Sequence, residues 1–192
     1  MSAAEQLGLI SEADYLAGEL TSRVKHEYLG GIVHAMAGAG NRHNDIVVNI
    51  TSALHARLRG LPCRPCNSDT KVRVRLASQI RYYYPDASVV CRPNPPEDSF
   101  HDEPVVVVEV LSPSTRRIDM TEKQEAYFAI PSLLVYLLVE QDSASVTLYC
   151  RTSCGFVAGV YSGLGAVVPL PEIGIDLPLG DVYERVEFTG EA

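Results

Sequence analysis

The feature that most constrains the fold is the segment 104–111, Pro-Val-Val-Val-Val-Glu-Val-Leu. Positions 105–108 are apolar on both alternating faces, a pattern typical of a central strand that is covered on both sides. The segment 84–91 carries β-branched residues and a proline near its start, so it predicts a second strand. Residues 92–99 between them are polar turn formers and predict a connecting loop.

The spacing within these two segments places two carboxylates together. If the strands pair antiparallel, Asp86 and Glu109 meet at one end of the pair, because Asp86 lies five residues before Cys91 and Glu109 five residues after Pro104. Two carboxylates with a nearby backbone carbonyl supply part of the oxygen shell that Mg²⁺ prefers, a site that favours phosphodiester hydrolysis. The alternative is a turn residue and a solvated strand end, since acidic residues close many strands.

Composition limits the class of protein and its partners. A chain of 192 residues with 46% hydrophobic and 21% charged residues predicts one soluble globular domain. Its formal net charge of −8 argues against a broadly basic surface, so contacts with nucleic acid must be local. The longest apolar runs are too short to span a membrane, and residues 1–6 lack the features of a signal peptide. We therefore expect a cytoplasmic protein.

The five cysteines are an odd number, which favours reduced thiols over a closed disulfide framework. Cys63 with Cys66 and Cys150 with Cys154 have spacings that could supply zinc thiolates. However, residues three apart on a strand point to opposite faces, and Cys63 and Cys66 lie at an expected strand entry. Buried or half-buried free thiols are therefore the favoured interpretation.

Helical signals occur in the first third of the chain. Ser11 predicts a short helix start, and Gly30 with Gly31 predicts a tight hairpin. A second helix could begin at Thr21 and Ser22 and extend to Glu27. Glu27 is then either an exposed carboxylate at the helix end or a residue that reaches a metal site. From position 42 an amphipathic helix is expected, with an apolar stripe of Ile46, Ile50, Leu54 and Leu58.

Two basic surfaces are expected, each open to a functional or a solvated interpretation. The helix face opposite the apolar stripe carries basic residues and is either a phosphate track or a solvated face; its members are Arg42, His43, His55, Arg57 and Arg59. The alternating segment 71–75 predicts a strand with basic residues on one face, either solvated or directed at the acidic pocket; its members are Lys71, Arg73 and Arg75.

The second half of the chain completes an α/β pattern. A helix is expected from about position 119 through 128, where Lys123 could form a surface ion pair with Asp119, worth a few tenths of a kcal/mol. Segment 133–140 predicts another buried strand, and short antiparallel strands are expected after position 145. A single α/β domain with a mixed sheet accounts for these elements.

The ordered motifs resemble the Uma family of restriction-endonuclease-like proteins, which belongs to the PD-(D/E)xK nuclease superfamily. The resemblance extends from about position 12 to about position 149. Its most specific part is Glu-Val-Leu-Ser-Pro-Ser-Thr, which follows the Pro-Asp of positions 85–86 at positions 109–115. The other matching residues are Arg42-His43-Asn44, Ser68-Asp69-x-Lys71-Val72, Lys123, Tyr127 and the strand Tyr136-x-Leu138-Val139.

This resemblance implies a nuclease-like domain over residues 1–192, with a core at about 12–150. The implied fold is a mixed β-sheet flanked by helices, with extra antiparallel strands at the C-terminus. Asp86 and Glu109 would hold Mg²⁺ or Mn²⁺ with the carbonyl of Val110, and Glu27 matches an acidic position that can complete the metal shell. We expect nucleic-acid contacts from Arg42, His43, Asn44, Arg73 and Arg116.

One departure from the superfamily concerns the catalytic lysine. The motif requires lysine two positions after the glutamate, where this chain has Leu111. A lysine there orients the nucleophile or stabilises the phosphate, so we expect a relocated lysine. Lys123 is the first candidate, because its helix begins just past the Glu109 strand, and Lys71 is the second.

Three functional hypotheses follow. The first is a Mg²⁺- or Mn²⁺-dependent DNA endonuclease, acting as a homodimer without a membrane or a small-molecule cofactor. The second is an inactive nuclease-fold module that binds nucleic acid or a protein, which the acidic charge and Leu111 favour. The third is an α/β protein with a deep apolar pocket for a metal-linked ligand. The sequence leaves the choice between DNA and RNA open.

Overall fold

The strand expected at 104–111 is β8 (Pro104–Leu111), which lies inside a six-stranded sheet. It pairs antiparallel with β6 (Ala87–Val90) and parallel with β9 (Val135–Glu140). Its residues Val106, Val107 and Val108 are fully buried, as expected of a strand covered on both faces. Because parallel and antiparallel pairs occur together, the sheet is mixed.

The computed structural model describes residues 8–188; segment 1–6, where we expect no signal peptide, lies outside them. The strand orders are β11-β10-β9-β8-β6-β3, β2-β1-β5-β4-β7 and β12-β13. The first sheet also contains β3 (Arg64–Asn67), β10 (Ser145–Thr152) and β11 (Gly155–Ser162). The second contains β1 (His26–Leu29), β2 (Ile32–Ala35), β4 (Lys71–Arg75), β5 (Ile80–Tyr83) and β7 (Phe100–His101). The C-terminal hairpin consists of β12 (Val167–Leu170) and β13 (Ile175–Pro178).

The helices begin and end close to the expected positions. In α2 (Glu12–Glu19), the Ser11 hydroxyl caps the helix by accepting from the backbone N–H of Asp14 at 3.1 Å. Helix α3 (Asn41–Leu58) buries its whole apolar stripe. The later helical segments are α4 (Arg116–Ile118), a π-helical turn (Asp119–Lys123), α5 (Gln124–Phe128), a 3₁₀ turn (Pro171–Ile173) and α6 (Leu179–Val182). Among residues 8–188, no helix has the length and apolar character needed to cross a membrane.

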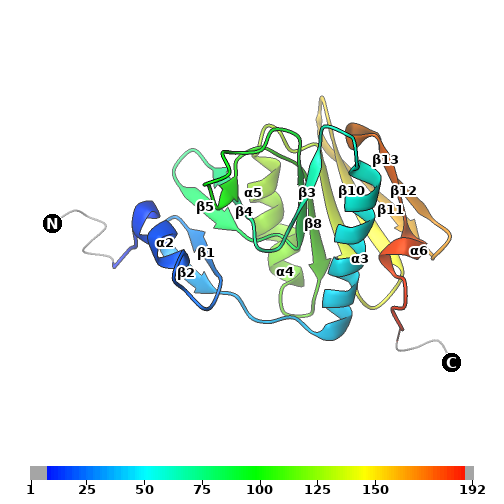
Figure 1. Ribbon diagram of the computed structural model, residues 1–192, viewed down its shortest axis with the longest axis horizontal. Coiled ribbons are helices and arrows are strands. Elements are labelled where there is room, and N and C mark those ends of the chain that lie inside the picture. The colour runs from blue at the N-terminus through cyan, green and yellow to red at the C-terminus, as the bar shows by residue number, and fades with distance from the viewer. Residues whose placement is uncertain (1–7, 189–192) are drawn as a thin grey trace.

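Helices cover both faces of the six-stranded sheet. On one face, α3 packs with the C-terminal hairpin and α6 against the inward side chains of the sheet (Figure 1). On the other face, α5 packs between this sheet and strands β4 and β5. This arrangement confirms the predicted fold class, a mixed sheet flanked by helices with antiparallel strands added at the C-terminus.

Two local expectations are wrong. The possible helical start at 21–27 is a turn that leads into β1, so Glu27 lies on a strand opposite His34, and the helix-end interpretation fails. His43 does not lie on a solvated helix face, because only 8% of its surface is exposed. A helix that packs in a cleft between a sheet and loops buries more than one stripe, and the local pattern cannot show this.

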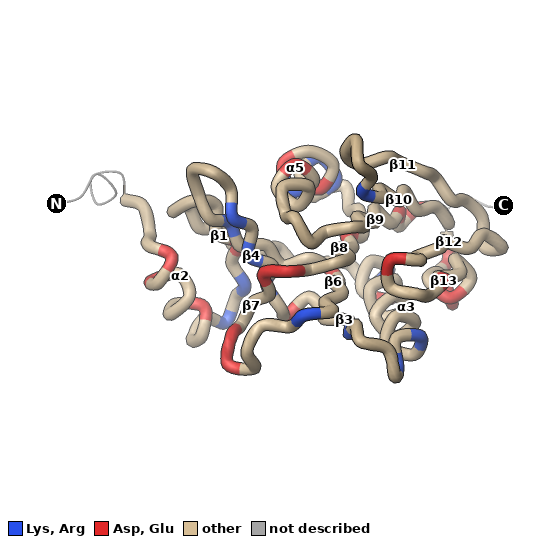
Figure 2. The backbone as a smooth tube through the Cα atoms, turned by 90° about the horizontal axis from the view of Figure 1, so that it is seen from above, with Lys and Arg blue, Asp and Glu red and all other residues tan. Residues whose placement is uncertain are grey.

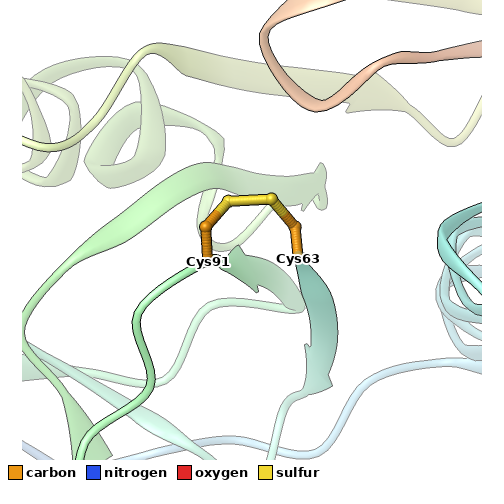
Figure 3. The surroundings of a disulfide bond; sticks show 2 residues. All are labelled: Cys63 and Cys91. Carbon is orange, nitrogen blue, oxygen red and sulfur yellow. A yellow bond between two sulfur atoms is a disulfide. The ribbon is translucent and has the colours of Figure 1, made fainter. Parts of the chain in front are cut away.

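Cys63 and Cys91 form a disulfide bond, which corrects the expectation that all five thiols are reduced (Figure 3). Strand β3 pairs antiparallel with β6, and the last pair in the register is Arg64 with Val90. One step further the two cysteines face each other, an alignment that depends on strand order and not on local sequence. Since Cys63 is used in this bond, the four-thiolate zinc alternative is excluded.

We expect the disulfide to stabilise the fold. It joins residues 28 positions apart, and a cross-link over a loop of this length contributes about 3 kcal/mol. Reduction, or the double change of Cys63→Ser and Cys91→Ser, should lower the free energy of unfolding in urea by about this amount. The control is Cys154→Ser, which removes an exposed free thiol and should have little effect. Five reactive thiols in the denatured protein before reduction would contradict the bond.

Candidate functional site

Asp86 and Glu109 meet at the end of the β6–β8 pair, as the spacing predicts. The register pairs Ala87 with Val108, so Asp86, one residue before Ala87, faces Glu109, one residue after Val108. The carboxylate Oδ2 of Asp86 accepts the backbone N–H of Val110 at 2.7 Å, which fixes the loop to the strand. Both carboxylates line one pocket with a volume of about 630 Å³.

Lys123 reaches this pocket from the π-helical turn between α4 and α5. Its Nζ lies 3.0 Å from Oε1 of Glu27, 3.4 Å from Oε1 of Glu109 and 3.5 Å from Oδ1 of Asp119. Its side chain is only 7% exposed, so the expected surface pair with Asp119 is a buried cluster instead. In such a cluster, the loss of one partner leaves an uncompensated buried charge.

Burial and mutual interaction shift the pKa values of this cluster. Burial raises the pKa of Glu109 well above its usual range, against the lowering effect of the Lys123 charge. Burial likewise raises the pKa of Asp119. For Lys123, burial acts to lower the pKa, but the carboxylates of Glu109, Glu27 and Asp119 outweigh it, and its pKa is raised. Lys123 therefore keeps its positive charge.

Two neighbouring side chains hold the candidate carboxylates in place. The Tyr127 hydroxyl donates to Oε1 of Glu109 at 3.0 Å. Nε2 of His43, on the first turns of α3, lies 3.2 Å from Oδ2 of Asp86. Burial acts to lower the pKa of His43, but the hydrogen bond and charge of Asp86 raise it overall. Each carboxylate thus has its own orienting partner.

The pocket chemistry fits a hard divalent cation. Within residues 8–188, no group of three or more His, Cys, Asp or Glu side chains is arranged to hold a metal. Mg²⁺ commonly uses only one or two protein carboxylates and keeps several waters. Five acidic side chains line the pocket, from Glu27, Asp86, Glu109, Asp119 and Glu122. Oε1 of Glu27 and Oδ1 of Asp119 are buried and lie 3.0 and 3.5 Å from the Lys123 ammonium, so this one positive charge is shared among several carboxylates and a cation would neutralise the remainder.

The second candidate lysine, Lys71, does not itself line the pocket. It is buried, and its Nζ donates at 3.2 Å to the hydroxyl of Tyr84, a residue of the pocket lining. Burial lowers the pKa of Lys71. Lys123 is therefore the candidate lysine that contacts Glu109.

The expected nucleic-acid contacts are scattered. Arg42 pairs with Asp142 at 3.1 Å, and Asn44 donates to the carbonyl of Ala39 at 3.4 Å. The Arg73 guanidinium forms two 2.7 Å bonds to Asp102, and Arg116 contacts Glu140 at 2.5 and 2.8 Å. Of this set, only His43 lines the pocket of Asp86 and Glu109. Arg73 and Arg116 are instead used in ion pairs within the fold.

Sequence reasoning missed Asp119 as a member of the site and gave Tyr127 no role there. Asp119, Lys123 and Tyr127 recur at four-residue spacing, which places them on one face of a helix. Such a polar helix face, which follows a buried strand in the sequence, could have identified all three residues as members of the site. The link between His43 and Asp86 had no comparable signal, because 43 residues separate them.

Comparison with known proteins gives consistent matches. A model of the Uma2 family, described as "Putative restriction endonuclease", matches residues 12–178. The protein slr1290 of Synechocystis sp. is 33% identical over 180 residues, which are 93% of this chain and 94% of that protein. The protein sll1609 of the same organism is 30% identical over 148 residues, which are 73% of this chain and 80% of that protein.

A solved structure shares the fold. A crystal structure from Anabaena variabilis, described as "a putative nuclease belonging to DUF820", aligns with a TM-score of 0.68 and 17% sequence identity. The alignment covers 84% of this chain and 91% of the other. At this level of identity the similarity shows the fold alone.

The contact between His43 and Asp86 predicts a pH-dependent pair. Asp86→Asn should lower the pKa of His43, because it removes the carboxylate whose hydrogen bond and charge oppose the effect of burial. In the unchanged protein the raised pKa stabilises the fold fully below about pH 6.5, and this contribution is lost as the pH rises through the folded value. NMR titration of the imidazole tests both statements. Asp69→Asn, which leaves the pair intact, is the control; an unchanged pKa in Asp86→Asn would refute the pair.

Proposed function

Since the chain belongs to the Uma2 family and has a restriction-endonuclease-like fold, we propose that it is a metal-dependent endonuclease that hydrolyses phosphodiester bonds in DNA. The single observation that carries this proposal is the contact of Lys123 with Glu109 at 3.4 Å. It supports the idea that a lysine from the following helix replaces the one absent at Leu111. The resemblance seen in the sequence alone is confirmed by the family match.

In the proposed site, Asp86, Glu109 and the Val110 carbonyl would hold Mg²⁺ or Mn²⁺, and Glu27 is a further candidate ligand. Such an ion supplies a bound water of lowered pKa and stabilises charge that develops on phosphate. His43 orients Asp86, and the Tyr127 hydroxyl orients Glu109. The charged ammonium of Lys123 aligns the attacking water or binds the scissile phosphate.

The carboxylates around Lys123 give it a defined position. Contacts with Glu27, Glu109 and Asp119 restrict the ammonium to the inner wall of the pocket and keep it protonated. A protonated lysine serves as an electrostatic group and not as a general base. A homodimer is part of the proposal, because one site of this size cuts one strand and two related sites cut both.

The alternative function is an inactive nuclease-fold module that binds nucleic acid or a protein. Leu111 and the engagement of Lys123 by three carboxylates favour this alternative. The two functions can be distinguished by one measurement, because a binding module hydrolyses no phosphodiester bond in the presence of any divalent metal ion.

Cleavage of supercoiled plasmid in Mg²⁺ and in Mn²⁺ tests the enzyme. Asp86→Ala and Lys123→Ala should each reduce the rate by about 10²-fold or more, since the first removes a proposed metal ligand and the second removes the ammonium proposed to act on the reacting phosphate. Lys71→Ala is the matched control and should retain cutting if it folds, as judged by circular dichroism. Cutting that survives Lys123→Ala but not Lys71→Ala would reassign the lysine. No cutting by the unchanged protein would favour the binding module.

Metal binding can be measured without catalysis. Mg²⁺ at about 100 times its dissociation constant should stabilise the fold by about 2.7 kcal/mol, because the ion binds the folded site and not the unfolded chain. Thermal unfolding with and without Mg²⁺ measures this effect. The double change of Asp86→Asn and Glu109→Gln should abolish it, whereas Asp69→Asn should not. A Mg²⁺ effect that is equal in all three proteins would exclude this pocket as the metal site.

A further inference from the structure

A second groove lies outside the candidate site, between the C-terminal half of α3 and strand β3. Its volume is about 790 Å³, within the range of ligand-binding pockets. The lining includes His55 from α3, Arg59 directly after that helix, Arg64 from β3 and His101 from β7, and none of its lining residues is Asp or Glu. Figure 2 shows Lys or Arg positions on α3 and beside β3. In a chain of net charge −8, this is a local basic surface.

The arginines of this groove differ from those first expected to contact nucleic acid. Arg73 and Arg116 each make a two-bond contact with a carboxylate, from Asp102 and Glu140 respectively. Within residues 8–188, Arg59 and Arg64 form no ion pair, and both are exposed. An exposed arginine without a carboxylate partner can bind phosphate without first breaking a contact within the fold.

His101 adds a donor of fixed position. The backbone N–H of Asn94 donates to its Nδ1 at 3.2 Å, so in the neutral ring Nε2 carries the proton. Burial and the nearby charge of Arg64 lower the pKa of His101. The neutral ring therefore presents one N–H, a suitable partner for a phosphate or sugar oxygen.

We propose that this groove binds the sugar-phosphate backbone of a DNA strand, through Arg59 and Arg64 with His101 as a further donor. The assignment of DNA rests on the proposed function; the anionic, hydrogen-bond-accepting character of the ligand follows from the groove. Phosphate contacts of this kind position a duplex without reading its sequence.

The groove lies at a useful distance from the candidate site. His43 contacts Asp86 near the start of α3, and His55 lines the groove twelve residues later. At 1.5 Å per residue these positions are about 18 Å apart along the helix axis. That length corresponds to roughly five base pairs at 3.4 Å each.

The test measures binding of a fluorescent DNA duplex of about 20 base pairs, in EDTA, so that no metal-dependent cutting occurs. The double change of Arg59→Gln and Arg64→Gln should weaken binding roughly tenfold. It should also make the slope of log K against log salt shallower by about 2, one for each lost phosphate contact. The matched control is Arg23→Gln with Arg185→Gln, which removes two exposed charges elsewhere and should bind as the unchanged protein does.

Four outcomes would contradict the proposal that this groove binds DNA. The double variant binds the duplex as tightly as the unchanged protein, or the control variant loses as much affinity as the double variant. Alternatively, poly-glutamate competes as well as unlabelled DNA, or the unchanged protein does not bind the duplex. Plasmid cutting is measured separately, with Asp86→Ala as the inactive reference, so that the two proposals can fail independently. If the unchanged protein cuts plasmid and the double variant binds DNA normally, the nuclease proposal stands and the groove proposal fails. If the double variant binds DNA more weakly and the unchanged protein cuts no plasmid, the groove proposal stands and the protein is a binding module.

Discussion

The antiparallel register of β6 and β8 is the constraint on which the candidate site depends. In a strand, a shift of one residue turns every side chain to the opposite face. Here Val106, Val107 and Val108 of β8 are buried on both faces of the sheet, and Ala87 pairs with Val108, so Asp86 must face Glu109. The bond from the N–H of Val110 to Asp86 then holds the carboxylate that lies just outside β6. The same packing that forms the core thus positions the two acids.

The charge balance of the pocket is the second determining factor. Carboxylates are costly to bury, and Glu109 is buried beside Glu27 and Asp119 with one ammonium among them. The π-helical turn brings Lys123 to this position, and such turns often occur at functional sites. A fold that needed only stability could fill this space with apolar side chains. The cluster is therefore consistent with the proposed role in binding a cation or a phosphate.

Some surface arginines form ion pairs within the fold, and others are free to bind a ligand. Arg73 is used to hold β4 to Asp102, and Arg116 to hold α4 to Glu140. Arg59 and Arg64 are exposed and form no ion pair among the described residues. In an acidic protein, basic groups that are unpaired and lie close together favour the binding of an anion. The disulfide at Cys63 anchors the start of the strand that carries Arg64 to the end of β6.

The sequence by itself determined the elements whose signal is local. These are the buried strand at 104–111, the apolar stripe of α3, the hairpin at Gly30 and the meeting of Asp86 with Glu109, whose strands are separated only by residues 91–103, which include β7. The preference for Lys123 over Lys71 also came from proximity along the chain. Hydrophobic period and short loop length carry this information, so no distant contact is needed.

Only the tertiary structure decided the contacts between segments far apart in the chain. The pairing of Cys63 with Cys91 depends on β3 lying next to β6, and the contact of His43 with Asp86 depends on how α3 packs. Glu27 became a partner of Lys123 because β1 lies in a sheet beside β5, which no local pattern indicated. The packing of the elements also determines which arginines form ion pairs and which are free to bind a ligand. The partners of a side chain depend on how whole helices and strands pack, whereas the hydrophobic periodicity of a segment depends only on residues that are close together in sequence.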